Sequence, residues 1–165
     1  ELKDIVMQRD EIIEDKFHKL IEKCEVLDIE GARKMEDFFK TISETLGKEL
    51  NLKPQDLCKR FIEREADSTT AIRQGLAIPH IIIKGEHIFK ILLVRAKTGV
   101  IFTGDQVAHI VFVIIGSADE RGLHLKALAA IAQITENPEF DKKWLGANNI
   151  EELRHIILLS ERRRG

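Results

Sequence analysis

The feature that most constrains the fold is a segment rich in valine and isoleucine, Val107 to Ile115, which contains an uninterrupted apolar run from Ile110 to Ile115. Valine and isoleucine favour extended backbone, because their branched side chains pack well on a pleated surface. A continuous apolar run of this length indicates a strand that is buried on both faces of its sheet. It is also far shorter than the roughly 18 apolar residues that a membrane-spanning helix needs. We therefore expect a sheet at the centre of a globular domain.

Helical segments alternate with further strand-like segments. The other predicted strands are Val26 to Ile29 at an edge of the sheet, Leu76 to Ile78, and Ile88 to Val94. The predicted helices carry apolar residues at intervals of three and four, and they cover residues 35–50, 54–65, 123–135, 140–145 and 150–159. This alternation predicts an α/β fold, a single domain with a mixed, mostly buried sheet of about five strands and helices on both faces.

The beginning of the chain predicts a separate amphipathic helix. Apolar residues from Leu2 to Ile21 lie on one helical stripe, and the opposite face is charged. Such a helix could pack on the domain, link it to another segment, or form the seam of a homodimer. We assign it to residues 1–23 and the main domain to residues 24–165. Because the chain begins with Glu1 rather than Met, we expect a fragment or a processed form.

The composition excludes several classes of protein. With 165 residues, of which 44% are hydrophobic, the chain can form one domain with a full core. Two cysteines make neither a disulfide framework nor a paired metal motif, which favours a reducing, cytoplasmic setting. A net charge of -2 with well-mixed acidic and basic residues argues against a nucleic-acid partner. We also find no secretory signal.

His80 is the first candidate for a chemical role. Pro79 lacks an amide donor and favours extended geometry at Ile78, so the predicted strand should stop there and leave His80 at its end or in a loop. Functional side chains of α/β proteins gather at such strand ends. The alternative is a histidine buried inside a strand.

His124 and a polar segment upstream of His80 could complete an anion site. His124 lies in the first turn of a predicted helix, where unpaired backbone N–H groups and the helix dipole favour an anion. The alternative is an ordinary histidine of the capping region with a solvated ring. Arg64 offers a guanidinium, and Thr69 and Thr70 offer hydroxyl donors, all of which suit phosphate. Arg64 could instead form an ion pair with a neighbouring glutamate.

Together these residues resemble the active-site signature of a known family. The segment from Arg64 to His80 contains Arg-Glu, Thr-Thr and Gly-Leu-Ala-Ile-Pro-His, and a run from His124 to Ala132 follows downstream. The pattern is similar to that of the fructose/mannitol-type enzyme IIA domains of the bacterial sugar phosphotransferase system. The resemblance extends from about Cys24 to the last predicted helix.

The resemblance implies a phosphotransferase with a phosphohistidine intermediate and without a metal or organic cofactor. His80 would accept a phosphoryl group from the histidine phosphocarrier protein and pass it to a IIB domain, or use it to regulate transport. His124 would stabilise the phosphoryl group, and Arg64, Thr69 and Thr70 would bind it. The alternative is a non-catalytic regulatory or binding domain of a membrane transporter that keeps the fold without phosphotransfer.

Two segments depart from the family pattern. Ala71 and Arg73 stand where glycine is frequent, and Ile81 and Ile82 stand where a glycine and a basic residue are common. The isoleucine flank and the segment from Asp119 to His124 are more similar to enzyme IIA domains fused behind membrane transporters or antiporters. On that interpretation the chain is the cytosolic domain of a membrane protein.

The remaining histidines lie outside the motif. None of them has a cysteine or an acidic residue at a metal-ligand spacing in the sequence. We therefore expect structural roles, and no metal site, for His18, His87, His109 and His155.

Overall fold

A seven-stranded sheet forms the centre of the computed structural model, which describes residues 15–31 and 33–162. The strands are β1 (Glu25–Ile29), β2 (Arg33–Lys34), β3 (Ala71–Arg73), β4 (Gly75–Ala77), β5 (His80–Ile83), β6 (Phe89–Phe102) and β7 (Gln106–Ser117). The helices are α2 (Lys16–Lys23), α3 (Met35–Leu50), α4 (Pro54–Asp67), α5 (Arg121–Glu136), α6 (Phe140–Gly146) and α7 (Ile150–Leu158), with short 3-10 turns at η1 (Thr103–Asp105) and η2 (Ala118–Glu120).

The two long strands organise the sheet. β6 and β7 pair antiparallel, β1 and β2 join β6 in parallel, and β4 and β5 join β7 in parallel. β3 completes the sheet by pairing antiparallel with β4, so β1 lies at an edge as predicted. The expected mixed sheet is confirmed. It has more than about five strands because three short ones, β2, β3 and β5, were not predicted.

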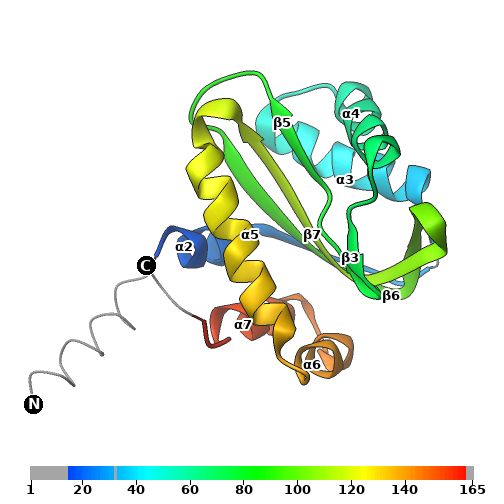
Figure 1. The fold of residues 1–165 in the computed structure, drawn as a ribbon, viewed down its shortest axis with the longest axis vertical. Coiled ribbons are helices and arrows are strands. Elements are labelled where there is room, and N and C mark those ends of the chain that lie inside the picture. The colour runs from blue at the N-terminus through cyan, green and yellow to red at the C-terminus, as the bar shows by residue number, and fades with distance from the viewer. Residues whose placement is uncertain (1–14, 32, 163–165) are drawn as a thin grey trace, which may run out of the picture.

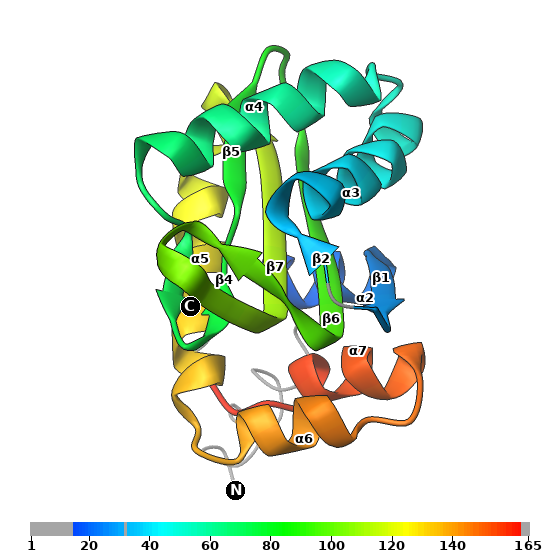
Figure 2. The ribbon, with the colours of Figure 1, turned by 90° about the vertical axis from the view of Figure 1, so that its right-hand side faces the viewer.

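Helices cover both faces of the sheet, as Figures 1 and 2 show. Helices α3 and α4 pack on one face, and α2, α5, α6 and α7 contribute to the core on the other. Along β7 the apolar run alternates between the two cores, with Phe112 in one and Val113 in the other, both fully buried. This explains why the run carries no polar alternation. None of the helices in the described ranges has the length and apolar character that crossing a bilayer requires.

The first described helix packs on the domain. The side chain of Asp15 caps α2 by accepting a hydrogen bond of 2.9 Å from the backbone N–H of His18, and Phe17 and Ile21 are buried in the core. The rest of the predicted N-terminal helix, residues 1–14, lies outside the described residues. The division of the chain after residue 23 and the homodimer seam stay predictions.

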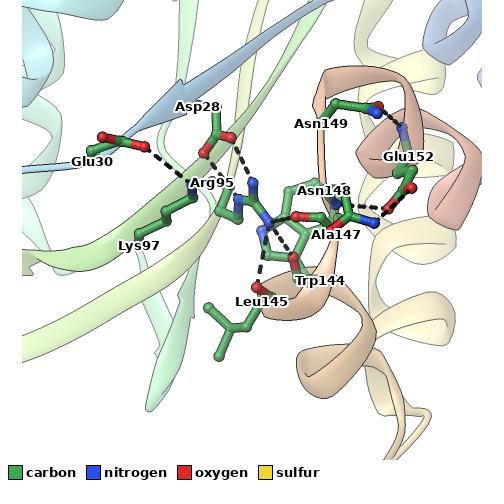
Figure 3. A network of polar contacts seen from close by, with 10 residues as sticks. All are labelled: Asp28, Glu30, Arg95, Lys97, Trp144, Leu145, Ala147, Asn148, Asn149 and Glu152. Atoms are coloured by element: carbon green, nitrogen blue, oxygen red, sulfur yellow. Dashed lines mark hydrogen bonds and ion pairs between the residues drawn. The ribbon is translucent and has the colours of Figure 1, made fainter.

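A buried guanidinium joins three elements of the fold (Figure 3). Arg95 of β6 is fully buried and donates two hydrogen bonds to Asp28 of β1, at 2.9 and 2.5 Å. Its Nη1 also donates to the carbonyls of Trp144, Leu145 and Ala147, at the carboxyl end of α6. The hydrogen bond from Arg95 holds the pKa of Asp28 below its usual value. Arg95 therefore fastens the edge strand and α6 to the centre of the sheet.

We predict that Asp28→Asn lowers the free energy of unfolding by about 3 kcal/mol, because a buried guanidinium would lose its counter-charge. The control is Glu30→Gln on the same edge, since the Glu30–Lys97 pair spans 3.2 Å between side chains that are 82% and 42% exposed. Such an exposed pair contributes roughly 0.5 kcal/mol. Urea unfolding followed by circular dichroism measures both values, and equal losses would contradict the prediction.

Candidate functional site

His80 lies at the start of a strand whose backbone is held from both sides. The chain leaves β4 after Ala77, and the N–H of Ile78 donates to the carbonyl of Thr70 at 2.9 Å. The N–H of Ile114 donates to the carbonyl of Pro79, also at 2.9 Å, and β5 then pairs in parallel with β7. The predicted strand stops before Pro79 as expected, but His80 begins a new strand instead of lying at the end of the first or in a loop. Pro79 interrupts the extended chain, but a new strand begins at once, and the His80 ring stays partly exposed.

The contacts of the His80 ring determine which nitrogen holds the proton. Nδ1 lies 2.7 Å from the carbonyl oxygen of Ile78, and a carbonyl can only accept, so Nδ1 is the donor. Nε2 lies 3.3 Å from Nη2 of Arg64, and a guanidinium can only donate, so Nε2 is the acceptor. In the neutral ring, Nε2 therefore carries the lone pair that a nucleophile needs, and Arg64 must release it before the attack.

Arg64 is held at the end of α4 and points toward His80. Its Nη1 donates to the carbonyl and the hydroxyl of Ser68, at 2.9 and 3.1 Å, which leaves Nη2 for the imidazole. Among the described residues, Arg64 forms no ion pair with Glu63 or Glu65. The alternative of a plain helix-end ion pair is therefore not what the structure contains.

His124 meets His80 from the first turn of α5. The two ring centroids are 5.3 Å apart and the ring planes are nearly perpendicular, while the ring of Phe89 packs against His124 at 6.2 Å. His124 is only 8% exposed, so the alternative of a solvated capping-region ring is wrong. Burial, and secondarily the nearby His80, lower the pKa of His124, which keeps its ring neutral near pH 7. Its Nδ1 is buried without a hydrogen-bond partner within the described part of the chain.

Glu65 is a central residue that the sequence pattern did not single out. Its buried carboxylate accepts hydrogen bonds from the Thr69 hydroxyl at 2.7 Å and from the Thr70 N–H and hydroxyl at 2.7 and 2.6 Å. Burial alone would raise the pKa of Glu65, but the hydrogen bonds from Thr70 and Thr69 hold it below its usual value. The hydroxyls of Thr69 and Thr70 thus both donate to Glu65. The expected contact of these two threonines with phosphate stays a prediction.

The Glu65 network reaches His80 through the backbone. The Glu65 carboxylate accepts a hydrogen bond from the N–H of Thr70, and the Thr70 carbonyl accepts one from the N–H of Ile78. The Ile78 carbonyl in turn accepts one from Nδ1 of His80. The signal for it in the sequence is the spacing of Glu65 and Thr69, four residues apart at a helix end. Glu65 is therefore a positioning residue for the imidazole.

We predict that Glu65→Gln lowers the free energy of unfolding at pH 7 by about 2 kcal/mol, because an amide accepts these hydrogen bonds less well and adds a buried donor. The pKa of Glu65 is lower in the folded state than in the unfolded state. Its contribution to the free energy of unfolding is therefore complete above the unfolded-state pKa and is lost as the pH falls through the folded-state pKa. Urea titrations at pH 7 and in acid should show a smaller acid loss for the variant. Glu63→Gln, at an exposed position, is the control and should leave the free energy of unfolding at pH 7 and its loss in acid unchanged.

Solved structures of other proteins have the same fold. The crystal structure of nitrogen regulatory protein IIA-Ntr from Neisseria meningitidis superposes with a TM-score of 0.75 at 22% identity, covering 87% of this chain and 99% of that one. IIA mannitol of Escherichia coli, solved in complex with phosphorylated enzyme IIB, has a TM-score of 0.64 at 15% identity. The match covers 80% of this chain and 92% of that one. The fold is that of an enzyme IIA domain.

Sequence comparison identifies the family. Residues 7–159 match the family described as "Phosphoenolpyruvate-dependent sugar phosphotransferase system, EIIA 2", and the chain belongs to this family. The resemblance inferred from the motif is thereby confirmed. A curated relative is the nitrogen regulatory protein of Escherichia coli strain K12, which is 28% identical over 123 residues, 73% of this chain and 76% of that protein.

Proposed function

We propose that the chain is a phosphohistidine carrier domain that accepts a phosphoryl group on Nε2 of His80. The donor is the histidine phosphocarrier protein, and the acceptor is a IIB domain or a transport protein regulated by the phosphorylation state. The observation that supports this most directly is the fixed tautomer of His80, with its acceptor nitrogen 3.3 Å from a guanidinium and its ring beside a second imidazole. We further propose a cytoplasmic location, free or as part of a membrane protein.

The chemistry needs only positioning and charge compensation. The Nε2 lone pair attacks the phosphorus of the donor's phosphohistidine in line, and a new N–P bond forms as the donor's N–P bond breaks. The bonding electron pair leaves with the donor imidazole. His80 keeps its Nδ1 proton, so the phosphorylated ring is cationic, and the Ile78 carbonyl stabilises that charge. A protonated ring is also the better leaving group for onward transfer.

The neighbours of His80 supply the charge compensation. The guanidinium of Arg64 now binds Nε2, and after transfer it would bind the phosphoryl oxygens, which attract it more strongly than a neutral nitrogen does. A neutral His124 can donate one hydrogen bond, and a phosphoryl oxygen on His80 would provide the partner that its ring lacks. Thr69 and Thr70 would contribute only if their hydroxyls turned away from Glu65.

A regulatory domain without phosphotransfer is the second candidate. It is favoured by the similarity to nitrogen regulatory proteins and by the apolar flank of His80, where Ile82 is 42% exposed. A partner protein could dock on such a surface without exchanging a phosphoryl group. The two functions differ in one measurable property, the formation of phosphohistidine.

We predict that incubation with phosphoenolpyruvate, enzyme I and the phosphocarrier protein labels the chain with acid-labile, base-stable phosphate. His80→Ala should abolish the label, because Nε2 of His80 is the acceptor atom. His155→Ala, which removes an exposed histidine of α7, is the control and should leave labelling unchanged. If several phosphocarrier proteins give no label, the regulatory alternative replaces the carrier function.

We also predict that His124→Ala slows onward transfer about tenfold, the loss expected for one hydrogen bond to a charged group. The phosphorylated form should decay faster, while the circular dichroism spectrum stays that of the wild type. Rapid-quench measurement of phosphate transfer to a IIB domain tests this. Rates equal to those of the wild type in both directions would remove His124 from the site.

A further inference from the structure

A second cluster of charged side chains lies at one end of the sheet, where the loop after β5 meets η2. Nδ1 of His87 lies 3.4 Å from Oδ2 of Asp119 and 3.7 Å from Oε1 of Glu120. All three ligand atoms lie within 4.8 Å of one another. We propose that these residues bind a divalent transition-metal ion, with Zn²⁺ as the probe, and that water completes the coordination.

The two separations from the His87 ring fit a shared ion better than a hydrogen-bonded pair. Ligands at the usual Zn–N and Zn–O distances, in a tetrahedral arrangement, lie about 3.4 Å from one another. The two separations from the His87 ring are close to that value, and both are longer than a normal hydrogen bond. No hydrogen bond between this ring and either carboxylate is formed within the described residues. One ion between the three side chains would satisfy all of them.

The backbone holds the cluster in this geometry without a metal. His87 adopts a positive φ of 57°, and its N–H donates to Oδ2 of Asp119 at 2.9 Å. The Ser117 hydroxyl accepts from the N–H of Ile88 at 3.0 Å and donates to the Ile88 carbonyl at 3.3 Å. The loop, the end of β7 and η2 are thus tied together. A ligand set that is already positioned loses less conformational freedom when it binds an ion.

The ligand types favour a transition metal over Mg²⁺ or Ca²⁺. Those two ions prefer sites made of oxygen ligands alone, whereas an imidazole with two carboxylates suits zinc and its neighbours. The side chain of His87 is 83% exposed, so an ion can enter directly and keep water ligands. We had expected a structural role for His87, because its carboxylate partners lie more than 30 positions downstream and no spacing pattern indicates them.

The cluster lies close to the proposed phosphoryl site but does not depend on it. Glu120 precedes His124 by four residues, and Phe89, two residues after His87, packs its ring on His124 at 6.2 Å. A bound ion would tie the β5–β6 loop to the start of α5, which carries His124. This inference stands whether or not His80 is phosphorylated.

Isothermal titration of the metal-free protein with Zn²⁺ tests the site. We expect one zinc per chain for the wild type and at least about tenfold weaker binding for His87→Ala and Asp119→Asn, each of which removes one ligand. The matched controls His155→Ala and His80→Ala should bind as the wild type does. Because His87 is exposed, the metal-free His87→Ala protein should melt at the wild-type temperature.

A second measurement assigns the ligand atom. In long-range proton–nitrogen correlation spectra, zinc should shift Nδ1 of His87 and leave His155 unchanged. Absence of binding by the wild type, or unchanged binding by His87→Ala, would overturn the proposal. Loss of binding in His80→Ala would also overturn it, because the ion would then lie between His80 and His124.

Discussion

The parallel pairing of β5 with β7 sets the position of His80 relative to His124. His80 of β5 pairs with Ile114 of β7. The chain continues from β7 through η2 into α5, which carries His124. β7 contributes side chains to the cores on both faces of the sheet, so a shift of its register would disrupt the packing of both. The two imidazoles therefore meet because one rigid strand positions both.

The sequence predicted most of the helices and the long strands, because these follow local rules. Helices α3 to α7 follow three-and-four spacing, and β6 and β7 follow from long apolar runs. The short strands could not be predicted in this way. β5 spans only His80–Ile83, and it exists because long-range pairing with β7 overrides the break at Pro79.

The candidate site was predictable in its residues but not in its connections. The motif resemblance indicated His80, His124 and Arg64, and the structure brings these three together. The i, i+4 spacing of Glu65 and Thr69 indicates their contact but not the burial on which the role of Glu65 depends. The cluster at His87 depends on a contact across the fold, which no spacing indicates. Arg73, which stands where the family often has glycine, also has a partner across the fold. Its guanidinium donates hydrogen bonds to Asp141 of α6 at 3.0 and 2.7 Å.

The buried contacts of Arg95 have a consequence for the way the molecule comes apart. The Arg95 guanidinium donates hydrogen bonds to both the edge strand and the end of α6. If either element detached, some of its N–H groups would stay buried without an acceptor. Loss of the C-terminal helices as a separate step is thus opposed by charge as well as by packing. We therefore expect the edge strand and the end of α6 to unfold together, although more than a hundred residues separate Asp28 from Ala147 in sequence.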